Sequence, residues 1–199
     1  MPAPNVARRD HLADAAIEVL GRLGARGLTH RAVDAEADEP PGTTSRYFRT
    51  RHALMCGAAE RIKVMHFADL ARAPRGPLAR AAVADHLAEL VIAALTRQRP
   101  RHLAALELFL EATRRPELRA VLTDARRAQI ALMREIHRTA GVDLTDHQAA
   151  ILVTGLTGLI FTALSTPEAI GLRRPEDVGD LVRHVVAAMP GACPGVAER

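Results

Sequence analysis

The chain has 199 residues, of which 48% are hydrophobic, 25% charged and 3% aromatic. This composition is typical of a globular chain that buries a core, and it excludes a disordered or fibrous protein. The longest nearly uncharged run, residues 148–164, is shorter than the ~20 apolar residues of a membrane span and is interrupted by Thr154, Gly155, Thr157 and Gly158. The N-terminus lacks the apolar core of a secretory signal. We therefore expect a cytoplasmic protein with no membrane contact.

The balance of charges and the cysteines point to no particular partner. Basic residues exceed acidic residues by 27 to 23, and this small excess does not by itself indicate nucleic-acid binding. Any contact with DNA must come from a local basic patch. Cys56 and Cys193 have neither metal-ligand spacing nor the density of a disulfide framework, which fits a reducing compartment.

The first two helices follow from apolar periodicity and capping residues. Apolar residues at helical spacing predict a first helix over residues 8–23, which ends at Gly24. Thr29 is the expected N-cap of a short second helix. Asp34 and Glu36 are expected on the solvated face of that helix.

Prolines and a second capping residue define the next elements. Residues 38–41, Asp-Glu-Pro-Pro, must end the second helix, and a third helix is expected over residues 41–48. Thr50 is the predicted cap of a long fourth helix over residues 51–72. The proline-rich and glycine-containing break at residues 73–77 is the expected domain boundary.

The remainder of the chain also has helical patterns. Five further helices are expected over residues 78–98, 102–114, 116–140 and 146–165 and from residue 175 onward. Thr145 and Gln148 form a capping-box pattern at the start of the most hydrophobic of these helices. No window alternates apolar and polar residues, so the predicted fold class is all-α with about nine helices and no sheet.

Two short helices joined by a tight turn and flanked by longer helices form a helix-turn-helix unit. The stretch GLTHRAVDAEADEPPGTTSRYFRTRHALM, residues 27–55, resembles the DNA-binding motif of the tetracycline-repressor (TetR) family of bacterial transcription regulators. The chain departs from that motif at residues 38–40, where Asp-Glu-Pro stands in place of the common Gly-Val-Ser. The matching positions are Gly24, Leu28, Thr29, Arg31, Val33, Ala37, Gly42, Thr43, Tyr47, Phe48, Arg51, Ala53 and Leu54.

The resemblance implies an N-terminal three-helix DNA-binding domain, residues 1–50, extended by the connecting helix 51–72. It also implies a C-terminal helical regulatory and dimerisation domain, residues 73–199. Such a protein is a homodimer that binds a double-stranded DNA operator, most often as a repressor, and is released by a small-molecule effector. In this family the last two long helices pair between subunits, and Gly155 and Gly158 leave room for that approach.

The residues expected to contact DNA gather around the third helix. A helix that enters the major groove needs small residues at its start, and the hydroxyl and free N–H groups there suit phosphates and base edges. Arg31 and Arg46 are expected to contact bases, and Arg51 is expected to hold a phosphate. The expected DNA-binding residues are Thr29, Arg31, Gly42, Thr43, Thr44, Ser45, Arg46, Tyr47 and Arg51.

Further basic side chains flank this set, and each has a simpler alternative. Arg49 adds to the basic patch, and Arg8 and Arg9 are candidates for the DNA backbone or minor groove. The alternative for Arg46, Arg49 and Arg51 is a solvated helix end, and for Tyr47 it is a half-buried packing role. The acidic residues at 34, 36, 38 and 39 are expected to form a solvated face and turn without DNA contact.

The fourth helix connects the DNA-binding motif to the predicted effector site. It runs for about 20 residues, roughly 30 Å at 1.5 Å per residue. A mostly apolar cavity is expected at its far end, suited to a moderately hydrophobic small molecule. The expected lining is Met65, His66, Phe67, Leu106, Phe109, Leu110, Met133, Thr154 and Thr157.

Two other functions remain open. One is a helical ligand-binding or protein-interaction module whose helix-turn-helix is only structural. The other is a helical enzyme that uses Glu107 and Glu111 as acid and base, although a salt bridge of Glu111 to Arg114 or Arg115 is favoured. The histidines lack converging partner ligands, and no catalytic triad or nucleotide fingerprint is present. We therefore expect no metal, no cofactor and no enzymatic activity.

Overall fold

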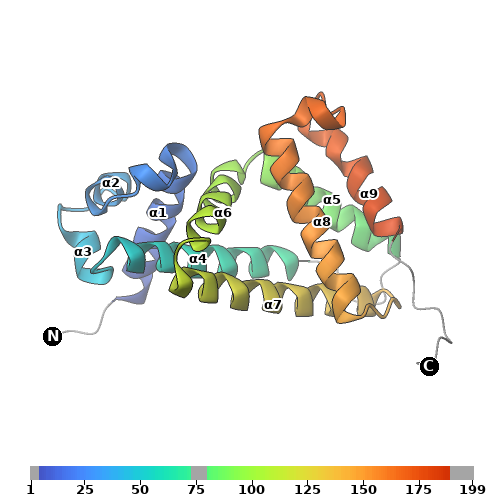
Figure 1. The fold of residues 1–199 in the computed structure, drawn as a ribbon, viewed down its shortest axis with the longest axis horizontal. Coiled ribbons are helices and arrows are strands. Elements are labelled where there is room, and N and C mark those ends of the chain that lie inside the picture. The colour runs from blue at the N-terminus through green and yellow to red at the C-terminus, as the bar shows by residue number, and fades with distance from the viewer. Residues whose placement is uncertain (1–4, 73–79, 189–199) are drawn as a thin grey trace. The chain divides into compact units, whose positions relative to one another are not determined.

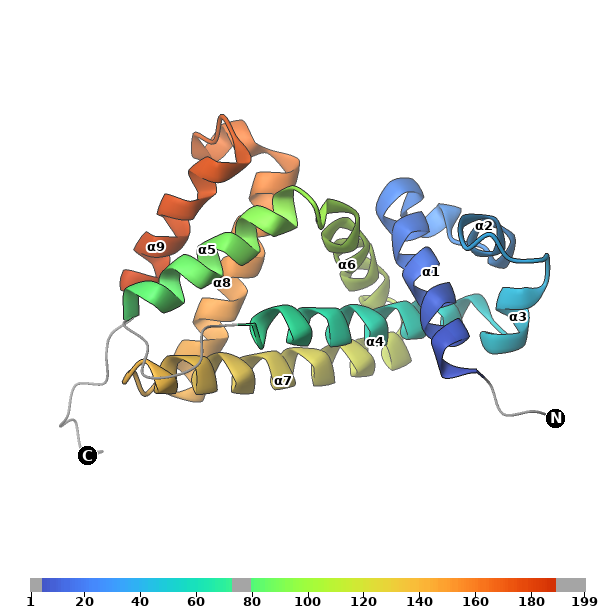
Figure 2. The same ribbon diagram turned by 180° about the vertical axis from the view of Figure 1, so that it is seen from behind.

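The computed structural model describes residues 5–72 and 80–188, and all regular secondary structure in this part of the chain is helical (Figures 1 and 2). It contains nine α-helices and two short 3₁₀ helices within these residues. The predicted all-α fold class is confirmed. The predicted break at residues 73–77 lies outside the described residues.

Two compact units make up the fold. The described residues up to Phe67, together with Gln98–Ala125, form the first unit. Residues from Ala68 to Arg97, together with those from Arg126 onward, form the second. The helix-turn-helix therefore packs in one unit with a later helix of the chain. The domain division at residues 50 and 73 stays a prediction.

The first helix is longer than its apolar pattern indicates. Helix α1 spans Val6–Gly27, and the side chain of Asn5 caps it by accepting the N–H of Arg8 at 3.3 Å. Gly24 interrupts the helical geometry with a φ of 67°, which is the point where the sequence predicts the helix end. The chain then forms a further turn, where Glu107 accepts the N–H of Ala25 at 2.8 Å.

The second helix begins and ends as predicted. Helix α2 spans His30–Glu36, and Thr29 caps it by accepting the N–H of Ala32 at 3.1 Å. Asp38 follows in the left-handed region with a φ of 51°. Aspartate tolerates this region better than most residues, so it can replace the glycine that is common here.

The third and fourth helices complete the motif. Helix α3 spans Thr43–Tyr47 and is shorter than predicted, because Gly42 takes a φ of 90° and stays outside the helix. Helix α4 spans Arg51–Leu70, and Thr50 caps it by accepting the N–H of Ala53 at 3.0 Å.

The core of the first unit forms where α1 packs against α2 and against α6, which spans Arg99–Ala112. Gly21 allows the close approach of α1 to α6, since an added Cβ would lie 2.3 Å from the carbonyl oxygen of Pro100. Pro100 lies in the first turn of α6, a position that suits proline, so α6 begins earlier than predicted. The largest fully buried side chains here include Leu12, Ile17, Leu20, Leu28, Phe48, Leu54, Met55, Leu108 and Leu118.

Helices α5 (Arg80–Leu95), α8 (Asp146–Ser165) and α9 (Val178–Ala187) contact one another in the second unit (Figures 1 and 2). Helix α7 (Pro116–Thr139) begins in the first unit and continues into the second. The predicted capping box at the start of α8 is confirmed, because Thr145 and Gln148 each accept the other's main-chain N–H. The core of this unit includes Val83, Leu87, Val91, Met133, Leu152, Val153, Val178, Val182 and Val186.

The chain between α8 and α9 differs from the prediction. Two 3₁₀ helices, Pro167–Ile170 and Pro175–Asp177, precede α9. Pro175 therefore opens a 3₁₀ turn rather than the last α-helix. The carboxylate of Asp177 closes this turn by accepting the N–H groups of Arg173 and Arg174 at 3.1 and 3.0 Å.

Helix α8 keeps one face exposed within the chain. Ile151 and Phe161 are 48% and 52% exposed, and Thr154, Gly155 and Gly158 are exposed between them. By length and composition alone α8 is long and apolar enough to cross a membrane, whereas the sequence predicted that residues 148–164 are too short and too interrupted for a span. Only 28% of its most apolar window is buried, so an apolar face of α8 stays open within the described part of the chain.

Candidate nucleic-acid interface

The surface of the helix-turn-helix carries several of the predicted DNA-contacting side chains. Arg31 on α2 and Ser45 and Arg46 on α3 are exposed. Thr29 and Arg49, just before α2 and just after α3, are exposed as well. These residues place three guanidinium groups and two hydroxyls around α3, the helix expected to enter the major groove and called the recognition helix below.

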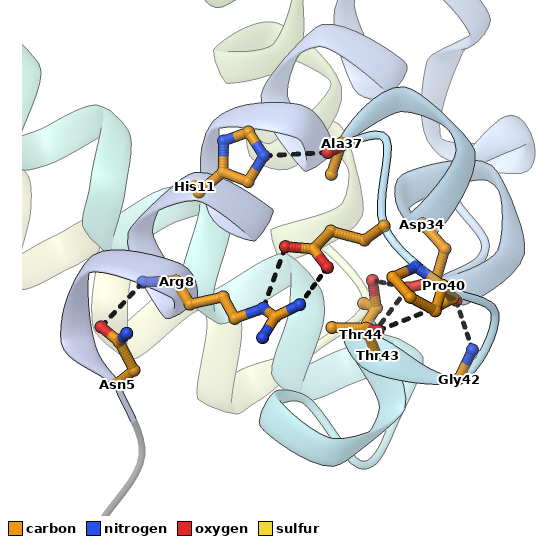
Figure 3. Close-up of polar contacts among 10 residues, drawn as sticks. Asn5, Arg8, His11, Asp34, Ala37, Pro40, Gly42, Thr43 and Thr44 are labelled. Carbon is orange, nitrogen blue, oxygen red and sulfur yellow. Dashed lines mark hydrogen bonds and ion pairs between the residues drawn. The ribbon is translucent and has the colours of Figure 1, made fainter.

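Asp34 lies on the buried side of α2. It is 3% exposed, and its carboxylate accepts the N–H of Gly42 at 2.7 Å, the N–H of Thr44 at 2.7 Å and the Thr44 hydroxyl at 2.5 Å (Figure 3). The expectation of a solvated Asp34 was therefore wrong. A signal was present, since at 100° per residue Asp34 lies about 60° from the buried Ala37 around the helix.

These bonds change the role of the residues at the start of α3. Thr44 is fully buried, so the prediction that it faces DNA was wrong. The Thr43 hydroxyl donates to the carbonyl oxygen of Pro40 at 2.7 Å. The N–H groups of Gly42 and Thr44 are used by Asp34, so they are not free for phosphate. Ser45 keeps its side chain at the surface, where its hydroxyl donates to the carbonyl oxygen of Gly42 at 2.8 Å.

Arg51 also has partners inside its own unit. Its guanidinium donates to the carbonyl oxygen of Leu28 at 3.0 Å and to that of Ala25. The side chain that was expected to hold a phosphate thus joins the start of α4 to the connection between α1 and α2. Tyr47 is half-buried against the core, and Phe48 is buried beneath the Arg9 guanidinium, which lies 5.1 Å from the ring centroid.

The acidic residues around the turn are paired with arginines of α1. Arg8 Nε donates to Glu39 at 2.9 Å (Figure 3), and Arg22 donates to Glu36 at 2.5 Å. The hydrogen bond from Arg8 lowers the pKa of the Glu39 carboxyl below its ordinary value. The carboxylates of Glu36 and Glu39, near the recognition helix, are therefore each paired with an arginine.

Two histidines bond to the ends of the short helices, which the sequence analysis missed. His11 Nε2 lies 2.9 Å from the carbonyl oxygen of Ala37 at the end of α2 (Figure 3). His30 Nε2 lies 2.6 Å from the carbonyl oxygen of Phe48 at the end of α3. Because a carbonyl only accepts, each ring donates from Nε2. Nothing local in the sequence indicates these partners, which are 26 and 18 residues away.

The predicted effector-binding residues are divided between the two units. The first unit holds Met65, His66, Phe67, Leu106, Phe109 and Leu110. Of these, Phe109 and Leu110 are 36% and 62% exposed, and the His66 ring lies 5.1 Å from that of His102. The second unit holds buried Met133, exposed Thr154 and half-buried Thr157. The cavity that would unite them stays a prediction.

One charged side chain beside this set was not predicted. Arg126 on α7 donates to the Thr157 hydroxyl at 2.9 Å and to Gln129 at 3.1 Å. Burial lowers the pKa of its guanidinium below the ordinary value. Thr157 is therefore already hydrogen-bonded across the α7 and α8 pair.

The two carboxylates considered for acid–base chemistry have structural partners. Glu107 bonds to the main chain at Ala25, and Glu111 pairs with Arg115 at 2.8 Å, one of the two salt bridges that the sequence favoured. The hydrogen bond from Arg115 lowers the pKa of Glu111. Among the residues that the structure describes, no three possible metal ligands gather.

A helix-turn-helix that exposes basic side chains around its third helix, in a chain whose described residues form only helices, is the architecture of a helix-turn-helix DNA-binding protein. Residues 78–189 match the family model described as Tetracyclin repressor-like, C-terminal domain, over more than half of the chain. The chain therefore belongs to the TetR family of transcriptional regulators, as its motif predicted.

Solved structures support the same assignment along nearly the whole chain. The multidrug binding protein EbrR, complexed with ethidium, is 32% identical and superposes with a TM-score of 0.70, covering 92% of this chain and 98% of that one. A TetR-family member from Streptomyces coelicolor A3, SCO1917, is also 32% identical, with a TM-score of 0.71 and coverage of 92% and 97%. The search of curated proteins found no match.

Proposed function

We propose that this TetR-family protein is a repressor that binds an inverted-repeat operator as a homodimer and leaves it when a small molecule binds. The observation that carries the proposal is the exposed set of Arg31, Ser45 and Arg46 around a recognition helix whose buried face is fixed. A guanidinium can pair with guanine through two hydrogen bonds, so Arg46 is the proposed base reader. Thr29, Tyr47 and Arg49 are proposed to hold phosphates.

The exposed face of α8 supports the proposal of a dimer. Ile151 and Phe161 are too exposed for a helix of this hydropathy in a monomer. At Gly155 and Gly158 an added Cβ would meet no described atom within 4 Å, so a second helix has room to approach. We propose that a second copy, rather than lipid, covers this face and that the protein is cytoplasmic. A two-fold dimer presents two equivalent recognition helices, hence the inverted repeat.

The proposed effector is a moderately hydrophobic small molecule. EbrR, 32% identical to this chain, is a multidrug binding protein seen with ethidium and, in another structure, with proflavin. Planar organic molecules of this kind agree with the moderately hydrophobic effector that the sequence predicts. We propose that the predicted lining residues, Met65 and Phe109 among them, contact the effector.

Selection of bound fragments from random duplex DNA tests this function. We expect the wild-type protein to enrich one inverted repeat, and Arg46→Ala to lose preference at one position in each half-site. Arg49→Ala should instead weaken binding to all sequences and flatten the salt dependence, because it removes a phosphate contact. Wild-type protein that enriches no sequence would favour the alternative of a ligand-binding module with a structural helix-turn-helix.

A further inference from the structure

The recognition helix is held at both ends by side chains of α2. At its start, Asp34 accepts the N–H groups of Gly42 and Thr44. At its end, His30 donates to the carbonyl oxygen of Phe48 at 2.6 Å. Asp34 and His30 lie four residues apart on α2, which is one helical turn.

Helix α3 cannot hold its own position. It has only five residues, and a helix of this length is not stable by itself in water. Its N-cap residue, Gly42, has no side chain with which to cap the first turn. The capping that a local serine or aspartate usually supplies comes instead from Asp34, across the turn.

The carboxylate fixes direction as well as distance. Its Oδ2 binds Gly42 and its Oδ1 binds Thr44, so two main-chain groups are tied to one rigid planar group. Hydrogen bonds weaken steeply when misaligned, whereas apolar contacts tolerate rotation. The bond from the Thr44 hydroxyl to Oδ1 adds a third constraint. The orientation of α3 on α2 is therefore set by Asp34.

We propose that Asp34 is a positioning residue for DNA recognition, which orients α3 so that Ser45 and Arg46 reach the base edges in one geometry. This inference rests on the proposed DNA-binding function. It assigns to a buried acid, which touches no DNA, a part of the sequence specificity. Base readout depends on such alignment because each specific contact is a directed hydrogen bond.

The direction in which a change of Asp34 alters DNA binding distinguishes positioning of α3 from repulsion between its charge and phosphate. A negative charge near the recognition helix opposes phosphate, so its removal alone should strengthen binding to every sequence. Loss of positioning should instead weaken operator binding and leave random DNA almost unaffected. Asp34→Asn keeps the shape and removes the charge, but its NH₂ group faces N–H donors. Asp38→Asn is the matched control, because Asp38 is exposed and asparagine accepts its positive φ.

The experiment measures the dissociation constants of the full-length protein for the selected operator and for random duplex by fluorescence anisotropy. We expect Asp34→Asn to reduce the ratio of the dissociation constant for random duplex to that for the operator about tenfold or more, the value of one good base contact. Asp38→Asn should leave this ratio unchanged. An Asp34→Asn protein that is folded and keeps the wild-type ratio overturns the proposal.

Two further measurements keep the outcome decisive. Thr44→Val keeps both main-chain bonds to Asp34 and the buried shape, so it should fold and reduce the ratio by less than Asp34→Asn. If Asp34→Asn does not fold, a wild-type ratio in Thr44→Val contradicts the proposal. Amide hydrogen exchange of residues 42–47 should be faster in Asp34→Asn, with or without DNA. Wild-type protein that selects no operator contradicts the DNA-binding function itself, whereas faster exchange with an unchanged ratio contradicts only the positioning role.

Discussion

At the scale of single residues, polar side chains bonded to main-chain groups hold the DNA-binding motif together. Helix ends leave N–H and C=O groups without partners inside the helix. Asp34 satisfies such groups at the start of α3, and His11 does so at the end of α2. Arg51 joins the start of α4 to the connection between α1 and α2. These side chains look like surface residues in the sequence, yet they determine the geometry of the motif.

The buried carboxylate of Asp34 should make stability depend on acid. Burial raises the pKa of Asp34, but the hydrogen bonds from Thr44 and Gly42 together lower it more, so the net pKa lies below the ordinary value. The unfolded chain then binds the proton more tightly, and stability rises with pH. The contribution of Asp34 is therefore present above the ordinary pKa of about 3.9 and is lost as the pH falls through its lower folded value.

Urea unfolding between pH 6 and pH 2 can measure this dependence. The free energy of unfolding of the wild-type protein should fall more steeply with acid than that of Asp34→Asn. Asp38→Asn should follow the wild-type curve, because the exposed Asp38 lies outside the hydrogen-bonded cluster. Parallel curves for the wild-type protein and Asp34→Asn would show that the carboxylate is not favoured by its bonds.

At the scale of helices, capping residues in the sequence predict where helices begin. They do not predict contacts between residues that are distant in the chain. Thr29, Thr50 and Thr145 each cap a helix within three residues, so a sequence pattern is enough to find them. The bond of Asp34 to Thr44 spans ten residues and a turn, and no periodicity contains it. The prolines were predicted less well. Pro100 lies in the first turn of α6 rather than before it, and Pro175 opens a 3₁₀ turn rather than the last α-helix.

The sequence also did not predict which helices pack together in one unit. Helix α6 packs on α1 within the first unit, and no pattern in the sequence indicates this contact. This packing depends on Gly21 and Pro100, which lie far apart in the chain. A glycine within a helix of good apolar periodicity gives no indication of what approaches it.

Because α1 and α6 approach closely at Gly21, adding one methyl group there should lower the stability of the protein markedly. In Gly21→Ala the new Cβ would lie 2.3 Å from the carbonyl oxygen of Pro100, which is main chain and cannot rotate away. Overpacking of this kind costs about 1 to 3 kcal/mol of stability, despite the better helix propensity of alanine. Thermal unfolding should show a lower Tm for Gly21→Ala, while Glu18→Ala, an exposed change in the same helix, should leave it near wild type. An unchanged or higher Tm for Gly21→Ala would mean that the two helices are not in contact there.

At the scale of the whole molecule, the proposed inverted-repeat operator needs two recognition helices, and the described part of one chain supplies one. The exposed face of α8 is where the second copy is proposed to bind. Apolar residues at its two ends, Ile151 and Phe161, flank the glycines that permit close approach. Membership of the family and the fold were predictable from the motif and the helical pattern, because both are properties of local sequence. The operator and the effector depend on surfaces whose partners lie outside the chain.

A charge in the centre of this face should separate folding from assembly. Within one chain Gly158 is exposed and an added Cβ would meet no described atom within 4 Å, so Gly158→Arg should fold as well as the wild-type protein. Across a dimer the same guanidinium would be buried against apolar residues, which is costly without a partner charge. We expect Gly158→Arg to sediment as a monomer and to bind the inverted repeat no better than a single half-site, because the second set of contacts is lost. Ala131→Arg places the same charge on the exposed side of α7 and should stay dimeric. If Gly158→Arg remains a dimer, the subunits meet elsewhere, and the exposed face of α8 must have another partner, such as lipid, which vesicle co-flotation of the wild-type protein would detect.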